Sequence, residues 1–253
     1  MPRLLVTLCT YNERENLELL VPEIHAVAPE AHVLVVDDNS PDGTGQYAQE
    51  LVTDDDRVHV LHREAKLGLG TAIVAGLKYG IAEGYEFVLN MDADFSHHPR
   101  YIPDLVGCMD NADVGIGSRY ITGGAAVGWG LKRHFMSRAI NAYARLLLGL
   151  RTRDNSGAFR CYRASKVAEL DFGRIVARGY AFQEEILYRC RRIGCRFRET
   201  PIVFEDRRFG TTKINWRESV AALWVIFRLG IENVIRVPVT TDAPLPRTAP
   251  TVD

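Results

Sequence analysis

The chain lacks three features that would point to common classes of protein. Its 253 residues carry 31 Lys and Arg against 32 Asp and Glu, and this balance gives no sign of bulk nucleic-acid binding. Five cysteines, an odd number without a CxxC pair, favour reduced thiols in the cytosol over a disulfide framework or a zinc site. No stretch reaches the ~20 apolar residues that a membrane-spanning helix needs. We therefore expect a cytoplasmic protein with no membrane span and no nucleic-acid partner.

The two ends of the chain differ from its middle. Residues 1–8 begin directly as a strand, without the apolar segment of a secretory leader. Residues 238–253 are rich in proline and threonine, which predicts a disordered tail. No repeat or linker interrupts the sequence before this tail, so we predict a single domain over residues 1–237.

The first 120 residues alternate between strand-like and helix-like patterns. This alternation predicts an α/β fold, with a mostly parallel central sheet and helices on both faces. We expect strands at Leu4–Leu8, Val33–Val36, Val58–Leu61, Phe87–Met91 and Val114–Ser118, and helices at Asn16–Ala28, Thr44–Val52, Gly70–Glu83 and Tyr101–Cys108. Ligands bind beyond the carboxyl ends of the strands in such sheets, and the polar clusters of this half fall there.

The second half is less regular. It has helical spacing in three places and one strand-like segment, joined by polar loops. The helices are expected at Phe135–Leu150, Gln183–Ile193 and Trp216–Val237, and the strand at Arg196–Phe204. A turn expected at residues 154–157 leads to Phe159–Tyr162.

Residues 88–99 are the most informative segment of the chain. An apolar run ends at Asp92 and Asp94, and Ser96, His97 and His98 follow. In an extended segment, side chains two residues apart point to the same side, so the two carboxylates can converge on one cation. Oxygen ligands suit Mg²⁺ or Mn²⁺. For the two histidines we favour hydrogen bonding over metal binding, because the expected ligands are hard oxygens.

Two loops in the first half allow more than one interpretation. Asp37 and Asp38 could accept hydrogen bonds from a nucleotide, whereas the segment 37–44 also reads as a turn followed by a helix start at Thr44. The glycine-rich segment Lys66–Ala72 could cradle a phosphate, or it could let a helix pack closely on the sheet. We favour the packing role for the second loop.

Basic and acidic residues in the second half are further candidates. Arg119 and Arg133 flank a glycine-rich loop, and arginine suits phosphate groups. A second basic loop spans Asp206–Lys213. Glu184 and Glu185 could be ordinary first-turn carboxylates of a helix.

Taken together, these segments resemble the dolichyl-phosphate mannosyltransferases (polyprenol monophosphomannose synthases) of glycosyltransferase family 2. The resemblance runs in order from Thr10 to Lys213. The matching segments are Thr10–Glu13, Asp37–Thr44, Leu67–Ala72, Met91–Pro99, Gly117–Tyr120, Trp129–Arg138, Ser156–Tyr162, Tyr180–Glu184 and Asp206–Lys213. Several segments in register are far more specific than any one of them.

The resemblance implies a GT-A (nucleotide-diphospho-sugar transferase) fold, with a nucleotide-binding half at 1–118 and an acceptor half with amphipathic helices at 119–237. It also implies GDP-mannose as donor and Mg²⁺ or Mn²⁺ as cofactor. Asp92, Asp94 and Arg119 would be the catalytic residues, and Asp92, Asp94 and Ser96 the metal ligands. Donor binding would use Tyr11, Glu13, Val36, Asp38, Asp92, Ala93, Asp94, Arg119, Arg207 and Lys213, and the acceptor phosphate would meet Arg133 and Ser137.

The implied reaction transfers mannose to a polyprenyl (dolichyl-type) monophosphate with inversion. The acceptor is a lipid, so the protein would lie on the cytoplasmic face of a membrane through its amphipathic helices, alone or with a membrane-anchored subunit. Ordinary core-facing helices are the alternative for those segments. Two other functions stay open: a related family 2 enzyme that uses a UDP-sugar, and a catalytically silent GT-A domain that acts as a binding subunit.

Overall fold

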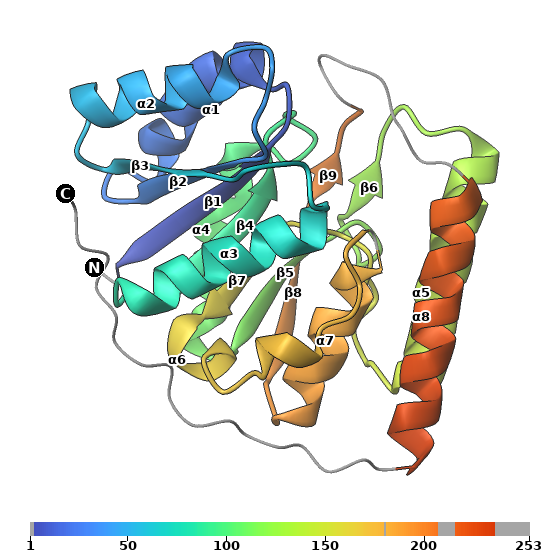
Figure 1. The fold of residues 1–253 in the computed structure, drawn as a ribbon. Coiled ribbons are helices and arrows are strands. Elements are labelled where there is room, and N and C mark those ends of the chain that lie inside the picture. The colour runs from blue at the N-terminus through green and yellow to red at the C-terminus, as the bar shows by residue number, and fades with distance from the viewer. Residues whose placement is uncertain (1–2, 180, 207–215, 236–253) are drawn as a thin grey trace.

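A computed structural model describes residues 3–179, 181–206 and 216–235, without the side chains of residues 216–219. Within these residues, seven strands form a central sheet in the order β3-β2-β1-β4-β7-β5-β8 (Figure 1). Two further short strands, β6 and β9, pair in parallel beside it. The strands are β1 (Leu4–Thr10), β2 (His32–Asp37), β3 (Val58–His62), β4 (Phe87–Asp92), β5 (Val114–Ser118), β6 (Ala125–Ala126), β7 (Arg160–Arg163), β8 (Phe197–Pro201) and β9 (Val203–Phe204).

Strand β7 is the one exception to the parallel sheet among the described strands. It pairs antiparallel with both β4 and β5, whereas the other pairs in the sheet are parallel. The mostly parallel sheet predicted from the sequence is therefore confirmed. An antiparallel strand begins where its parallel neighbours end. As a result, the turn at residues 154–157 lies at the same edge of the sheet as the end of β4.

Helices cover both faces of the sheet, as predicted. One core lies between the sheet and α1, α2 and α4, and the other between the sheet and α3, α5, α7 and α8 (Figure 1). The α-helices are α1 (Arg14–Val27), α2 (Thr44–Asp54), α3 (Leu69–Ala82), α4 (Ile102–Gly107), α5 (Leu131–Leu148), α6 (Ala164–Val167), α7 (Phe182–Arg192) and α8 (Trp216–Ile235), and short 3-10 turns span Pro99–Tyr101, Cys108–Asp110 and Phe172–Arg174.

Side-chain alternation along β4 sets the orientation of the polar residues at its end. Leu89 and Met91 face the core under α1 and α4, whereas Val88 faces the core under α3 and α7. Because successive side chains of a strand point to opposite faces, Asn90 and Asp92 project toward the α3 and α7 side. Asp92, the first of the two carboxylates, therefore points toward the face of the sheet that α3 and α7 cover.

Helix α5 begins one turn earlier than predicted, at Leu131 rather than Phe135. The first turn contains Lys132, Arg133 and His134, so the apolar spacing does not extend into it. Extended backbone at Gly130 precedes the helix. Left-handed backbone at Gly149, with a φ of +64°, ends it, and this conformation is one that glycine adopts without steric cost.

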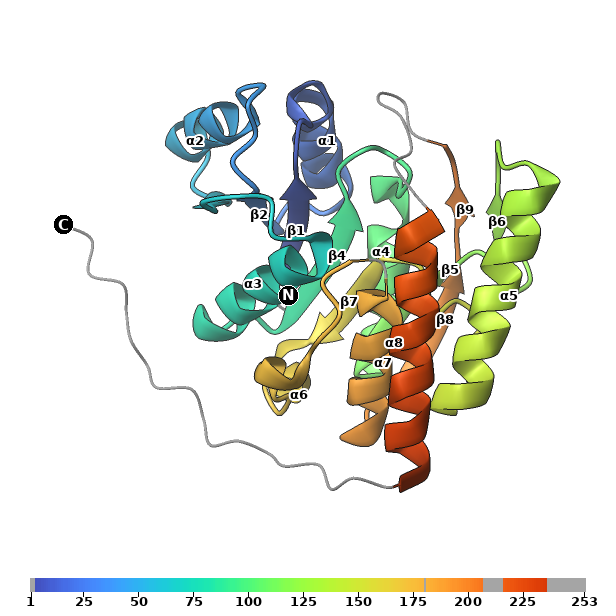
Figure 2. The ribbon, with the colours of Figure 1, turned by 45° about the vertical axis from the view of Figure 1, so that its right-hand side comes forward.

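Helices α5 and α8 pack side by side along one flank of the molecule (Figure 2). Their approach is close at Gly230, where an added Cβ would lie 3.0 Å from the Cβ of Leu147. Asn233 Nδ2 also donates to the carbonyl of Leu147. Among the described residues, no helix is long and apolar enough to cross a membrane. The predicted tail at 238–253 lies outside the described residues.

Candidate active site

The carboxylate pair lies at the end of β4, where the sequence predicts it. The Asp92 side chain is one-third exposed, and Asp94 is buried. Oδ1 of Asp94 accepts hydrogen bonds from the backbone N–H of Ser96 (3.1 Å) and from its hydroxyl (2.6 Å). Between them, Phe95 has a φ of +65°, which is uncommon for a bulky residue and marks a tightly specified turn. Ser96 therefore holds Asp94 in place, whether or not it also contacts a metal.

The side chain of His97 supports Asp92 through a hydrogen bond to the backbone of Asp92. Its Nδ1 accepts a hydrogen bond from the backbone N–H of Asp92 (3.0 Å), and its ring stacks on Phe159 at 5.0 Å. Burial lowers the pKa of His97, which keeps Nδ1 able to accept. His98 Nδ1 accepts from the backbone N–H of Arg100. Both histidines thus make the hydrogen bonds that the sequence analysis favours.

The donor set at this edge fits a hard divalent cation that shares its ligands with a substrate. Among the residues that the structure describes, no three His, Cys, Asp or Glu side chains are grouped closely enough to hold a metal ion alone. Mg²⁺ is commonly held by one or two carboxylates together with substrate phosphates. Asp92 and Asp94 satisfy that pattern.

The predicted nucleoside-binding residues surround the ends of β1 and β2. Lys66 Nζ lies 3.9 Å from the centre of the Tyr11 ring, and Glu13 Oε2 accepts a 2.6 Å hydrogen bond from Asn16 Nδ2. Arg63, which the sequence analysis did not single out, pairs with Asp38 at 2.6 Å. Burial raises the pKa of Asp38, although Arg63 opposes this.

Two of the predicted donor residues are held in the protein interior. The side chain of Val36 is fully buried in the core beneath α3, and Ala93 is buried in the core on the other face. A ligand would therefore meet the backbone of Val36 rather than its side chain. Their role in donor binding stays a prediction, and Arg207 and Lys213 lie outside the described residues.

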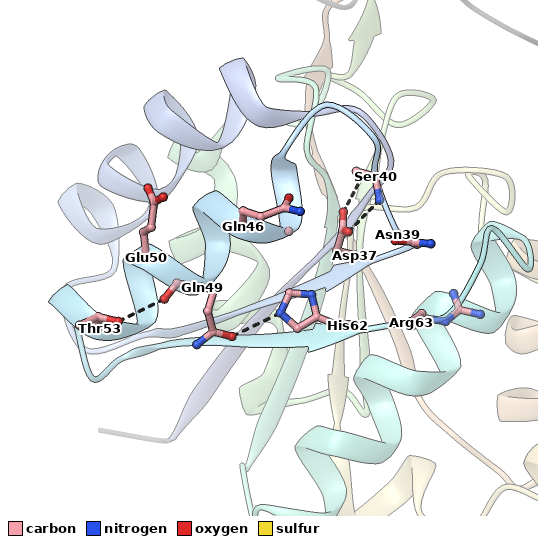
Figure 3. Close-up of a pocket in the computed structure, with 10 residues that line it drawn as sticks. Asp37, Asn39, Ser40, Gln46, Gln49, Glu50, Thr53, His62 and Arg63 are labelled. Carbon is pink, nitrogen blue, oxygen red and sulfur yellow. Dashed lines mark hydrogen bonds between the residues drawn. The ribbon is translucent and has the colours of Figure 1, made fainter.

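Asp37 is the last residue of β2, and its carboxylate holds the turn that follows. Its carboxylate accepts from the hydroxyls of Thr10 (2.9 Å) and Ser40 (2.5 Å) and from the backbone N–H of Ser40. It also lines a pocket of about 400 Å³ between α2 and β3, where His62 and Gln49 are hydrogen-bonded (Figure 3). Asp38, Asp92 and Asp94 do not line this pocket. The turn interpretation of residues 37–44 therefore accounts for Asp37, and α2 begins at Thr44 as expected.

The glycine-rich loop before α3 has the packing role. An added Cβ at Gly68, whose φ is +102°, would lie 2.6 Å from the carbonyl oxygen of Arg178. At Gly70 it would lie 2.8 Å from the Phe182 ring. Glycine at these positions lets α3 approach the start of α7.

Arg119 is buried and paired. Its Nε and Nη2 donate to the two carboxylate oxygens of Asp154, each at 2.7 Å, and Nη2 also donates to Ser156. Burial alone would lower the pKa of Arg119, but Asp154 raises it, and Asp92 adds to that effect. The structure therefore brings Arg119 near the carboxylate pair, and it assigns Arg119 a fixed partner that sequence reasoning missed.

Arg133 and Ser137 lie four residues apart on α5 and so share a face of the helix. Arg133 Nη1 pairs with Asp206 at 3.4 Å near the surface. The Ser137 hydroxyl accepts from the hydroxyl of Tyr120 (2.6 Å), the residue after Arg119. The predicted acceptor residues therefore adjoin the Arg119 segment.

Glu184 and Glu185 are both buried, which their first-turn position did not predict. Glu185 accepts from the backbone N–H groups of Val176 and Ala177 and pairs with Arg189, so it is structural. Burial raises the pKa of Glu184 to about 7. Arg119 opposes this rise in pKa, whereas Asp154 adds to it.

Comparison with known proteins identifies the family to which the chain is similar. A family model described as Glycosyl transferase family 2 matches residues 5–171. A polyprenol monophosphomannose synthase of Mycolicibacterium smegmatis is 42% identical over 233 residues, 91% of this chain and 88% of its own. An undecaprenyl-phosphate mannosyltransferase of Micrococcus luteus is 42% identical over 213 residues, 84% of this chain and 88% of its own.

Solved structures show the same fold at lower identity. One is a mannosyltransferase from Pyrobaculum calidifontis in complex with GDP-Man and Mn²⁺, with a TM-score of 0.60 and 15% identity over 94% of this chain and 65% of that chain. Another is glucosyl-3-phosphoglycerate synthase from Mycobacterium tuberculosis with Mn²⁺, UDP and phosphoglyceric acid, with a TM-score of 0.63 and 19% identity over 94% of this chain and 80% of that chain.

The sheet and the helices on its two faces form the GT-A fold of glycosyltransferases. Within that class, the chain belongs to glycosyl transferase family 2.

Proposed function

We propose that the protein transfers mannose from GDP-mannose to a polyprenyl monophosphate and forms β-mannosyl phosphopolyprenol. Two relatives at 42% identity, each matched over most of both chains, are named for mannosyl transfer to such lipids. The observation that carries the proposal is the placement of Asp92 and Asp94 at one edge of the sheet, with Arg119 beside them and Arg133 in the adjoining helix.

Asp92 and Asp94 would hold the metal ion and, through it, the diphosphate of the donor. A bound Mg²⁺ or Mn²⁺ would supply positive charge that stabilises the departing GDP. Arg119 would add a guanidinium at the same edge, and Arg207 and Lys213 would close on the diphosphate. Tyr11, Glu13 and Asp38 would contact the guanosine.

The transfer itself needs little acid–base chemistry. A polyprenyl monophosphate is already anionic near neutral pH, so its oxygen can attack the anomeric carbon without a general base. The new bond forms between that oxygen and the anomeric carbon, and the bond to the GDP oxygen breaks. Attack from the face opposite GDP inverts the configuration. Arg133 and Ser137 would orient the attacking phosphate by charge-assisted and neutral hydrogen bonds.

The exposed apolar side chains of α5 and α8 support contact with a membrane surface. Leu131 and Phe135 at the start of α5 are 90% and 72% exposed, and Trp224 on α8 is 64% exposed. Further exposed apolar side chains on the two helices are Met136, Leu146, Val220, Leu223, Phe227, Ile231, Val234 and Ile235. We propose that this flank lies on the cytoplasmic face of the membrane that holds the acceptor, alone or with a membrane-anchored subunit.

The experiment compares GDP-mannose with UDP-glucose as the donor. Each donor, labelled in its sugar, is incubated with the protein, Mn²⁺ and membranes that contain polyprenyl phosphate, and the label in the lipid extract is identified by mass spectrometry. We expect mannose from GDP-mannose in the lipid and tighter calorimetric binding of GDP than of UDP. Transfer from UDP-glucose alone would establish the UDP-sugar alternative instead. Metal-dependent binding of GDP-mannose without any transfer would indicate a binding subunit.

A further inference from the structure

Trp129 lies between β6 and α5, and its indole ring contacts the guanidinium groups of two arginines. The guanidinium carbon of Arg133 is 4.1 Å from the ring centre, and that of Arg119 is 5.2 Å from it. Both distances are within the range of a cation–π contact, in which a guanidinium is attracted to the negative face of an aromatic ring. Arg119, at the edge of the sheet that carries the carboxylate pair, and Arg133, on the adjoining helix, therefore contact the same ring.

The same ring is linked to the metal-binding turn through other aromatic side chains. Phe204 on β9 lies edge-on to Trp129, with 5.4 Å between the ring centres. Phe204 also lies edge-on to His97 at 5.5 Å, and His97 accepts the hydrogen bond from the backbone of Asp92. A continuous series of packed rings thus runs from Arg133 to the end of β4.

The two cations differ in how firmly the rest of the protein holds them. Arg119 is buried and forms a bidentate pair with Asp154. Arg133 is one-third exposed, and its pair with Asp206 is long, at 3.4 Å. Long surface pairs contribute little to the position of a side chain. The Trp129 ring is therefore the better-defined contact of Arg133, and it fixes the position of Arg133 relative to Arg119.

We propose that Trp129 is a positioning residue for acceptor binding. Its indole ring holds Arg133 in a defined position relative to Arg119 and the Asp92 turn, and in that position Arg133 binds the phosphate of an isoprenyl monophosphate. The inference rests on the proposed function, because it needs an acceptor that carries a phosphate. It assigns Trp129 no contact with the reacting atoms. Trp129 acts through Arg133, and replacement of the indole weakens acceptor binding only while the arginine is present.

A double-mutant cycle tests this coupling. Binding of a short, water-soluble isoprenyl monophosphate is measured by calorimetry for the wild type, Trp129→Leu, Arg133→Ala and the double variant, in the presence of GDP and Mn²⁺. We expect about a 10-fold loss of affinity in Trp129→Leu. In the Arg133→Ala background, the same change should cost less than about 2-fold. Trp129→Phe keeps an aromatic face and should recover most of the affinity.

Two controls separate positioning from a general structural effect. The binding of GDP with Mn²⁺ should change by less than about 2-fold in Trp129→Leu, because Arg119 keeps its bidentate pair with Asp154 and the Asp92 turn keeps its hydrogen bond to His97. Phe172→Leu removes a different aromatic ring, which lies 5.8 Å from Lys78, and it should leave binding of the isoprenyl phosphate unchanged.

Each outcome decides the question. If the double variant loses affinity by the product of the two single losses, Trp129 and Arg133 act independently and the positioning role is overturned. Equal losses of affinity in Trp129→Phe and Trp129→Leu would overturn it as well. Both results would leave the proposed function intact. Loss of GDP binding in Trp129→Leu would also overturn the positioning role, since the residue would then support the whole site. A wild-type protein that binds GDP with Mn²⁺ but no isoprenyl phosphate would overturn the proposed acceptor, and this inference with it.

Discussion

The backbone N–H of Asp92 donates a 3.0 Å hydrogen bond to Nδ1 of the buried His97, five residues further along the chain. This bond closes the turn that carries both carboxylates. The turn also contains Phe95 with left-handed backbone, so its conformation depends on contacts rather than on local preference. The geometry of the carboxylate pair is therefore coupled to one imidazole.

Replacement of His97 by Phe keeps the packed ring but removes the acceptor. The lost hydrogen bond is part-buried and contributes about 1 kcal/mol, and we expect the turn to relax in response. Affinity for GDP with Mn²⁺, measured by calorimetry, should fall about 10-fold. His98→Ala serves as the control, because that ring is partly exposed and only begins a short 3-10 turn. Equal affinities in wild type and His97→Phe would show that the bond does not organise the site.

The buried pair of Arg119 and Asp154 should be sensitive to the loss of either partner. Asp154→Ala leaves a buried guanidinium without its carboxylate, a change that typically costs about 3–5 kcal/mol. The free energy of unfolding, measured in urea, should fall by that order. The control is Arg196→Ala, which removes a pair with Asp113 whose arginine is 65% exposed, and it should cost less than about 1 kcal/mol. Similar losses in the two variants would mean that burial does not distinguish the pairs.

Arg133→Ala tests whether Arg133 binds the acceptor phosphate rather than the donor diphosphate. Loss of a charge-assisted contact to a phosphate costs about 2 kcal/mol or more. The apparent KM for polyprenyl phosphate should therefore rise at least about 10-fold, and GDP-mannose affinity should stay nearly unchanged. Arg207→Ala should weaken the donor side instead. The opposite pattern in initial-rate measurements would mean that the two basic clusters have exchanged roles.

Glu184 should make the stability of the protein fall with pH. Its pKa is raised by burial from 4.5 to about 7, so the folded chain holds a proton that the unfolded chain releases at lower pH. The contribution of Glu184 to the free energy of unfolding is greatest below pH 4.5. It falls by about 3 kcal/mol in all as the pH rises from 4.5 to 7.

Glu184→Gln removes this titration while keeping the shape of the side chain. Urea unfolding at pH 5 and pH 8 should show a smaller loss of stability for Glu184→Gln than for the wild type. Glu30→Gln, at an exposed position, should follow the wild type. A Glu184→Gln profile that runs parallel to that of the wild type would show that Glu184 ionises in the folded protein as it does in water.

The sequence predicts the elements of this fold better than the contacts of its site. The strand before Asp92 follows from its apolar run and its alternation, and the position of the carboxylates follows from the parallel sheet. The partner of Arg119 does not follow, because Asp154 reaches it only through the antiparallel placement of β7. Trp129 stands in a segment that the family resemblance marks, but no spacing rule places one indole beside two arginines.

The burial of Glu184 and Val36 could not be predicted from the local sequence either. A first-turn glutamate is usually solvated, whereas Glu184 is buried where α7 packs into the core. The family resemblance assigns Val36 to donor binding, whereas the inner place of its strand in the sheet buries its side chain in the core. In both cases tertiary packing decides the environment of a residue whose local pattern is ordinary.

The most direct measurement is the rate of mannosyl transfer by the purified protein. The protein is incubated with GDP-mannose and a polyprenyl monophosphate in Mn²⁺ or in EDTA, and the product lipid is quantified by mass spectrometry. Asp92→Asn and Asp94→Asn are compared with the exposed Asp56→Asn. The account predicts mannosyl phosphopolyprenol with the wild type and Asp56→Asn in Mn²⁺, and loss of transfer in EDTA or in either site variant. Transfer at the wild-type rate by either site variant, or by the wild type in EDTA, would contradict it.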